Sequence, residues 1–277
     1  MENTLIFSIV VYNEKYWDSV TFKSLLSSYH QSNKNEKIHI LVFDNTISPN
    51  KFTPLLEENN VDVTYFSFNE NRGISHAYNF LHNVATNKGF EWIVFLDQDT
   101  LLPEDFYQVY SNKVKETFHT PIFIPLVKLN TGEIFSPSVY RNFRHYKIPQ
   151  VTRYLNLRDH SAINSGLLIN CDFFKQLGGY NENLFLDFCD HDFFDKVRKE
   201  IDQIEILDVE LLQNFSGETN ELNNALVRYK IFLRDLNVYK KNKNKLALFF
   251  FVDLPHLLKI TYKYKTTKFI TDRLKNK

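Results

Sequence analysis

Short, fully apolar runs alternate with stretches of helical periodicity in the first hundred residues. Four runs have the length and the β-branched or aromatic content of buried strands. They span residues 5–11, 38–43, 61–66 and 92–96. Helical patterns follow the first three, over 17–29, from Pro54 onward, and over 73–85. Strands that alternate with helices predict an α/β fold with a mostly parallel sheet flanked by helices.

The pattern is less regular after residue 100. We expect one more helical segment and two more strands before residue 170, then two further helices. The predicted helices span 103–117, 172–176 and 190–199, and the predicted strands span 122–129 and 162–169. A basic stretch over 136–160 reads as a loop. Beyond Leu222 the pattern is helical and basic.

Charge divides the chain unevenly. Residues 228–277 contain 14 Lys and Arg against 3 Asp and Glu, a net +11, although the whole chain sums to zero. The remainder therefore carries −11. We expect one domain over 1–220, with halves at about 1–100 and 101–220, and a helical basic extension over 221–277.

Polar side chains stand at the carboxyl ends of all four early strands. Asn13 follows the first strand, Asp44 ends the second, the turn 71–73 follows the third, and Asp97 and Asp99 follow the fourth. Ligands of open parallel sheets bind beyond these ends. Core packing does not explain four polar clusters at equivalent positions, so we expect one binding cleft there.

Asp97 and Asp99 form an Asp-x-Asp motif at the mouth of a buried strand. Two carboxylates in such a turn suit Mg²⁺ or Mn²⁺, which takes one or two carboxylates and then substrate phosphates. The plain alternative is a solvated turn. A haloacid-dehalogenase phosphatase is disfavoured, because Thr100 follows immediately and the motif does not open the domain.

Three acids, Asp187, Asp190 and Asp192, surround the start of the helix predicted over 190–199. Carboxylates this close repel one another, which would raise the pKa of one of them. The alternative is a solvated helix N-terminus, where the helix dipole favours acids.

The ordered set of motifs resembles the family-2 inverting glycosyltransferases with the GT-A fold. It comprises IVVYN (9–13), VFDN (42–45), NRGISHAYN (71–79), FLDQDT (95–100), INSGLLI (163–169) and ENLFLDFCDHDFF (182–194). The resemblance covers about residues 5–217. The LDQD, INSGLLI and LFLDFCDHD forms look most like the bacterial rhamnosyltransferase-like branch.

This resemblance implies a role for each matching residue. The donor-binding set is Val11, Tyr12, Asn13, Asp44, Arg72, Asn79 and Asp97. Within it, Asp44 would accept a hydrogen bond from the nucleobase, and Asp97 would bind the donor sugar or ribose.

The resemblance also assigns Asp99 to Mn²⁺ or Mg²⁺, Asp190 to the catalytic base, and Asp192 and Gly166 to acceptor binding or its support. The sequence departs from the family near the end of the matched region. Many members have a His there, whereas this chain has Gln213-Asn214, which are weaker metal ligands.

The implied activity is transfer of a sugar from a nucleotide-sugar donor to a saccharide or lipid-linked acceptor in bacterial surface polysaccharide synthesis. Rhamnose from dTDP-rhamnose is the leading donor, with UDP-hexose and UDP-galactofuranose as alternatives. A sugar nucleotidyltransferase is disfavoured because no Gly-rich loop follows the first strand. An inactive binding subunit would be expected to lose an acid, and Asp97, Asp99 and Asp190 are all present.

The basic extension interleaves aromatic and Lys residues, as in LALFFFVDLPHLLKI and TYKYKTTKF. That pattern is typical of an interfacial helix on an anionic membrane. The alternatives are helices packed on the body and a dimer interface; no nucleic-acid motif is present. With only two Cys and no disulfide framework, the chain is expected in the cytoplasm. The basic extension would allow a peripheral location at the inner face of the plasma membrane.

Overall fold

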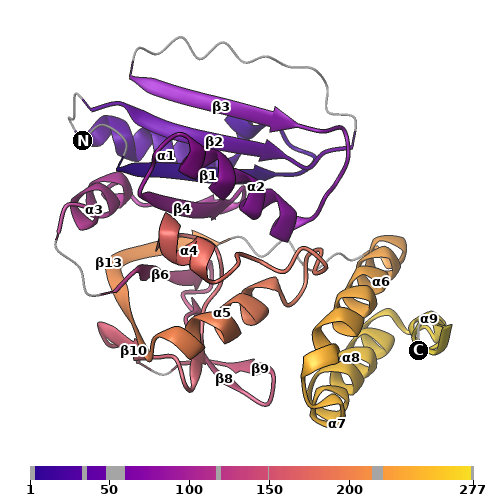
Figure 1. The fold of residues 1–277 in the computed structure, drawn as a ribbon. Helices are drawn as coiled ribbons and strands as arrows, with labels where there is room; N and C mark the ends of the chain where they lie inside the picture. The colour runs from indigo at the N-terminus through magenta and orange to yellow at the C-terminus, as the bar shows by residue number, and fades with distance from the viewer. Residues whose placement is uncertain are drawn as a thin grey trace.

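A twisted, mostly parallel sheet forms the centre of the computed structural model (Figure 1). The structure describes residues 4–32, 36–47, 60–116, 120–148, 150–213 and 221–275. The main sheet has the strand order β10-β13-β6-β12-β4-β1-β2-β3. The small strands β5 and β7 pair at its side, and β11-β8-β9 form a second sheet. This confirms the predicted α/β class.

The first four strands match the predicted apolar runs. They are β1 (Leu5–Val11), β2 (Ile38–Asp44), β3 (Val61–Ser67) and β4 (Trp92–Asp97). All of them are mutually parallel, with β1 between β2 and β4. The chain therefore reverses its winding direction between β1 and β4, which is where open sheets of this kind bind ligands.

The second half adds β5 (Thr100–Leu101), β6 (Ile122–Leu129), β7 (Ile134–Ser136), β8 (Ser138–Arg141), β9 (Arg144–Tyr146), β10 (Tyr154–Asn156), β11 (His160–Ser161), β12 (Leu167–Asn170) and β13 (Gln203–Gln213). Strand β12 runs antiparallel to both β4 and β6 and joins the two halves into one sheet.

Helices cover both faces of the sheet. They are η1 (Tyr16–Asp18), α1 (Val20–Gln31), α2 (Ile74–Asn87), α3 (Phe106–Lys113), α4 (Cys171–Gln176) and α5 (Cys189–Glu200). Alternate side chains of each strand supply two separate cores. One core includes Phe95 and residues of α2, α4 and α5, whereas the other includes Phe7 and residues of α1 and α3. Burial on both faces explains the continuous apolar runs.

The C-terminal helices are α6 (Leu222–Tyr239), η2 (Lys240–Asn242), α7 (Lys245–Leu248), η3 (Phe249–Asp253), α8 (Leu254–Tyr264) and α9 (Lys268–Lys275). They form a separate group at the lower right of Figure 1, with α6 next to the body. None of the helices in the described ranges combines the length and apolarity that crossing a bilayer would require. The predicted domain limit at residue 220 falls outside the described residues, so the division stays a prediction.

Several predicted elements are wrong. The stretch 136–160 is not a loop but holds β8, β9 and β10, whose polar and aromatic residues lack a buried apolar run. The strand predicted over 162–169 begins only at Leu167, because Gly166 turns the chain with a φ of 82°. The long strand β13 carries no prediction at all. The helix predicted from Pro54 lies outside the described residues.

Two helix boundaries also differ. The pattern over 17–29 is split at Ser19, whose side chain accepts a hydrogen bond from the backbone N–H of Phe22 and so caps α1. The helix predicted over 103–117 is shorter and begins at Phe106.

Candidate active site

The register of the parallel strands brings the predicted polar residues to one edge. Val10 lies opposite Asp97 of β4, and Val11 lies opposite Asp44 of β2. Asp44 in turn lies opposite Ser67 of β3. The backbone ladder alone thus aligns four strand ends at the switch between β1 and β4.

Hydrogen bonds between the connecting loops fix this edge further. The backbone N–H of Tyr12 donates to Oε1 of Gln98 at 2.5 Å, and Nε2 of Gln98 donates to the Tyr12 carbonyl at 3.3 Å. The N–H of Asn13, in a left-handed conformation with φ 56°, donates to the hydroxyl of Thr46 at 2.8 Å. Tyr12 remains 44% exposed, which leaves its ring open to a ligand.

Asp44 is buried at the end of β2. One carboxylate oxygen accepts from the N–H of Thr46 at 2.8 Å, and the other accepts from the hydroxyl of Tyr65 at 2.6 Å. Each oxygen has a further lone pair, so the carboxylate keeps acceptor capacity for a ligand N–H.

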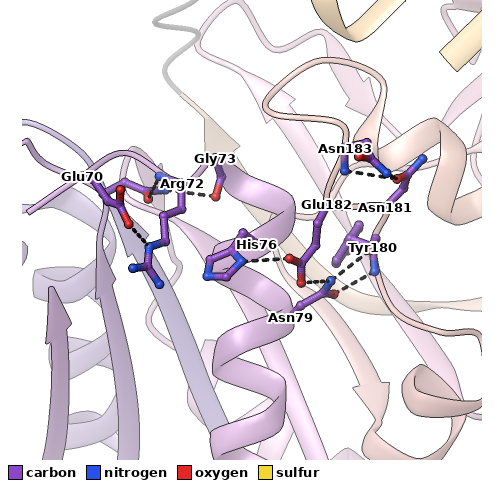
Figure 2. A network of polar contacts seen from close by, with 10 residues as sticks. Glu70, Arg72, Gly73, His76, Asn79, Tyr180, Asn181, Glu182 and Asn183 are labelled. Carbon is purple, nitrogen blue, oxygen red and sulfur yellow. Dashed lines mark hydrogen bonds and ion pairs between the residues drawn. The ribbon is translucent and has the colours of Figure 1, made fainter. Parts of the chain in front are cut away.

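Asn45 connects this edge to the turn before α2. Its Oδ1 accepts from the N–H of Arg72 at 3.0 Å, and its Nδ2 donates to the carbonyl of Gly73 at 3.3 Å. The guanidinium of Arg72 bonds Glu70 at 2.5 Å (Figure 2). It also stacks 4.0 Å from the ring centre of Phe68. Arg72 therefore lies at the predicted edge with its charge paired to a surface acid.

The side-chain amide of Asn79 bonds another segment of the chain. Its Nδ2 donates to the Tyr180 carbonyl at 2.9 Å and to Glu182 at 3.0 Å, and its Oδ1 accepts from the Tyr180 N–H at 2.8 Å. Figure 2 shows this network, in which Nδ1 of His76 also lies 2.9 Å from Glu182. Both amide hydrogens of Asn79 are used to hold the segment 180–182 against α2, and its predicted contact with the nucleotide-sugar donor stays a prediction.

Asp97 is held by two side chains that the sequence analysis did not single out. The hydroxyl of Tyr78 donates to Oδ1 at 2.8 Å, and the hydroxyl of Ser165 donates to Oδ2 at 2.5 Å. Tyr78 comes from α2 and Ser165 from the turn before β12. Both residues lie inside quoted motifs, SHAYN and INSG, but the sequence does not show that they converge on one carboxylate.

Asp190 lies in the first turn of α5 and is half-buried. Burial raises the pKa of its carboxyl to about 8, and the charges of Asp97 and, more weakly, Asp187 act in the same direction. The charges of Asp190 and Asp97 also both raise the pKa of the buried Tyr180 hydroxyl. The structure thus brings Asp97 and Asp190 together, and Asp190 is not a solvated helix end.

Asp99 lies in the turn between β4 and β5. Thr100, the next residue, pairs with Gln213 at the end of β13. Oε1 of Gln213 is buried and accepts no hydrogen bond from the residues that the structure describes. A carboxylate and an unsatisfied amide oxygen on adjacent strand ends fit a hard cation such as Mn²⁺ or Mg²⁺. Groups of three or more His, Cys, Asp or Glu that could hold a metal do not occur in the described ranges, so phosphate oxygens would have to complete the shell. Asn214 lies outside the described residues.

The other two predicted residues are Asp192 and Gly166. Asp192 lines a cavity of about 520 Å³ between α5 and the C-terminal helices, together with Asp195 and Lys196. Gly166 has a φ of 82° next to Ser165, and a Cβ there would stand 2.5 Å from Pro125. Gly166 therefore supports the turn that carries the Ser165 hydroxyl, whereas an acceptor contact by Asp192 stays a prediction.

Comparison with known proteins agrees with this architecture. The family model for glycosyl transferase family 2 matches residues 7–178. The dTDP-rhamnosyl transferase RfbF of Shigella flexneri is 25% identical over 160 residues, which cover 57% of this chain and 53% of that protein. The chain thus spans about half the length of this curated relative.

Solved structures with the same fold include two that were determined with a nucleotide and Mn²⁺. GalNAc-T7 with UDP, GalNAc and Mn²⁺ has a TM-score of 0.57 at 14% identity, covering 87% of this chain and 48% of that one. The mannosyltransferase PcManGT from Pyrobaculum calidifontis, with GDP-Man and Mn²⁺, has a TM-score of 0.57 at 15% identity, covering 90% and 67%. These likenesses show the GT-A fold. With more than half of its residues matched by the family model, the chain belongs to glycosyl transferase family 2.

Proposed function

We propose that this chain is an inverting glycosyltransferase that moves a sugar from a nucleoside-diphosphate donor to an acceptor hydroxyl. The observation that carries the proposal is the pair of carboxylates, Asp97 and Asp190, that lie near each other at the carboxyl ends of the paired strands β1 and β4. One of them is fixed by hydroxyl donors, and the other has a pKa suited to a base.

The donor would lie along the strand ends. The Val11–Asn13 segment and Asp44 would hold the nucleoside, with the free lone pairs of Asp44 directed to a base N–H. Arg72 would reach the diphosphate if it released Glu70 and bound the ligand instead. Its ion pair with Glu70 joins two partly exposed side chains and is therefore weak. Asp97, oriented by Tyr78 and Ser165, would accept from a sugar or ribose hydroxyl.

Asp99 and the amide oxygen of Gln213 would hold Mn²⁺ or Mg²⁺. When bound, the ion would supply positive charge against the phosphates of the leaving group. The Mn²⁺ in the GalNAc-T7 and PcManGT structures supports this assignment.

Asp190 would act as the general base. Its carboxylate takes the proton of the acceptor hydroxyl while that oxygen attacks the anomeric carbon, and the nucleoside diphosphate leaves from the opposite face. The reaction therefore inverts the configuration. A base with a pKa near 8 retains the proton affinity that this transfer requires.

Rhamnose from dTDP-rhamnose is the donor that we favour, because RfbF is a dTDP-rhamnosyl transferase. UDP-hexose and UDP-galactofuranose are the alternatives within the same chemistry. The acceptor would be a saccharide or a lipid-linked saccharide of a bacterial surface polymer.

The C-terminal helices would rest on an anionic membrane surface. Four large apolar side chains spaced by four or eight residues along α7, η3 and α8 are more than half exposed: Leu246 (72%), Phe250 (59%), Leu258 (59%) and Tyr262 (87%). Lys245, Lys259 and Lys263 flank them and are also exposed. The one acid between these lysines, Asp253, is buried against Arg273. This combination of exposed apolar groups and exposed positive charge complements anionic lipid.

A donor panel tests the function. Purified protein is mixed with dTDP-rhamnose, UDP-glucose or UDP-galactofuranose, with and without Mn²⁺, and thermal stability and nucleoside diphosphate release are measured. We expect one donor to stabilise the fold and to be consumed only with the ion. Pyrophosphate release from dTTP and a sugar 1-phosphate would instead indicate a nucleotidyltransferase. Donor binding that never led to turnover, with any acceptor extract, would indicate an inactive subunit.

A further inference from the structure

The segment Phe185–Phe188, which leads into α5, is held from two sides. On the side of α2, the N–H of Ile74 donates to the Phe185 carbonyl at 2.8 Å. Gly73 permits this approach, because a Cβ there would stand 2.6 Å from the same carbonyl oxygen. Phe188 ends the segment in a left-handed conformation with φ 65° and caps α5. The segment therefore sets the direction in which α5 begins, and Asp190 lies two residues later.

On the other side, the segment is held by Asp235 in the middle of α6. Its carboxylate accepts from three consecutive backbone N–H groups, those of Phe185 at 3.0 Å, Leu186 at 2.8 Å and Asp187 at 2.8 Å. Asp235 is fully buried. A buried carboxylate needs such donors, and the three N–H groups lie in the loop before α5, outside any helix or strand.

A second residue of α6 acts on the same segment. The guanidinium of Arg228 makes a two-pronged bond to Asp187, with Nη2 2.6 Å from Oδ1 and Nη1 in contact with Oδ2. Bidentate pairs of this kind fix orientation as well as charge. Both contacts reach from a helix beyond the family-matched region into the loop before the candidate base.

We propose that Asp235 and Arg228 are positioning residues for sugar transfer: they fix the Phe185–Phe188 segment and thereby both the place and the charge surroundings of Asp190. The proposal rests on the role of Asp190 in the proposed function. It makes α6 part of the machinery of the reaction and not only a support for the C-terminal helices.

The charges around Asp190 allow the effect of Arg228 to be measured separately from that of Asp235. The groups that act on its ionisation or respond to it are Asp97 of β4, Asp187 of the loop, Cys189 of α5, Tyr78 of α2 and Tyr180. The charge of Asp187 raises the pKa of Asp190, and Arg228 opposes that charge. Loss of Arg228 should therefore raise the pKa of Asp190, and loss of Asp187 should lower it.

Two readouts follow the ionisation of Asp190. The first is the rising limb of turnover against pH, with dTDP-rhamnose as donor. The second needs no donor: it is the gain in unfolding free energy caused by Asp190→Asn, measured by denaturation at each pH. The folded-state pKa of Asp190 lies above its unfolded value, so the charged carboxyl destabilises the fold increasingly as pH rises, and the gain levels off above the folded-state pKa.

The test uses the full chain. Arg228→Met should move both readouts to higher pH by about half a unit to one unit, Asp187→Asn should move them to lower pH, and Arg228→Lys should restore most of the wild-type position. Asp235→Asn presents an NH₂ group to backbone N–H donors, so we expect turnover to fall roughly 10–100-fold with the KM for the donor little changed.

Arg273→Met is the matched control. Arg273 makes a comparable bond to the buried Asp253 within the C-terminal helices, with Nε 2.7 Å from Oδ2. Its loss should lower thermal stability without moving the pH readouts or the turnover of folded protein.

The proposal is overturned if Arg228→Met and Asp235→Asn lower stability alone, as Arg273→Met does, while the pH readouts stay in place. If Asp235→Asn does not fold, the Arg228 and Asp187 variants still decide. If the wild type consumes none of the donors, the proposed function fails, whereas the denaturation readout continues to test the positioning of Asp190.

Discussion

The two sides of the candidate site, which we propose to hold the nucleotide and the acceptor, are held together by different kinds of contact. At the nucleotide side, Val11, Asp44 and Asp97 are placed by the backbone ladder of four parallel strands. At the acceptor side, Asp190 follows a loop that is held by side chains from α2 and α6. A ladder distributes its support over many bonds, whereas the loop depends on a few. Single substitutions should therefore damage the acceptor side more selectively.

The sharpest test of this contrast concerns two acids in the first turn of α5. Asp190→Asn should reduce turnover by about 10²–10⁴-fold because the base is removed, with donor affinity unchanged. Turnover and donor-induced thermal shifts measure the two quantities separately. Asp192→Asn is the matched control, since Asp192 faces the cavity toward the C-terminal helices, and it should stay within severalfold of wild type. Equal losses from both variants would remove the distinction between the two acids.

On the nucleotide side, Asp99→Asn should remove the dependence of donor binding on Mn²⁺. A donor present at a hundred times its Kd stabilises the fold by about 2.7 kcal/mol, and this shift should shrink toward its value in EDTA. Thermal unfolding with donor, with and without Mn²⁺, provides the measurement. An undiminished ion-dependent shift in Asp99→Asn would show that the ion is held elsewhere.

The contact between the two sides can be tested at Gly73. Gly73→Ala should cost about 2–3 kcal/mol of unfolding free energy, because φ is 84° and the new Cβ would meet the Phe185 carbonyl. Gly132→Ala is a control with a φ of 80° and open space around it, so it should cost only about 1 kcal/mol. Chemical denaturation measures both. Equal costs would mean that the close approach to Phe185 relaxes freely.

The exposed apolar face of the C-terminal helices lies outside both sides of the candidate site. Substitutions there should have the smallest effect on turnover. Phe250→Ser should weaken binding to vesicles rich in phosphatidylglycerol by roughly tenfold and leave turnover in solution unchanged. Tyr154→Ser removes an exposed aromatic side chain from β10 and serves as the control. Cosedimentation measures binding. Concentration-dependent dimers that Phe250→Ser abolishes, with no vesicle binding, would assign this face to a second copy of the chain.

The same contrast explains what the sequence could reveal. Buried parallel strands require continuous apolar runs, so β1 to β4 and the polar residues at their ends were predictable within one or two positions. The short strands β8 and β9 pair with each other in a polar hairpin, and β10 pairs with the distant β13, so none of the three carries a continuous apolar run.

The candidate site divides in the same way. Asp44, Asp97 and Asp190 could be named because each ends or begins a predictable element. Tyr78 and Ser165 could not be assigned to Asp97, since the convergence depends on the packing of α2 and the Gly166 turn. Asn79 was expected to bind the donor, but the fold uses its amide to hold the segment 180–182.

The reach of α6 into the acid loop also bears on how such enzymes can be recombined. A chimera that joins the sheet of this chain to the C-terminal helices of a relative would keep its nucleotide edge intact whatever helices it received. It would leave three backbone N–H groups and the Asp187 carboxylate without partners unless the incoming helix carried equivalents of Asp235 and Arg228. Exchange of acceptor modules is therefore restricted to helices that bring this carboxylate and this guanidinium with them.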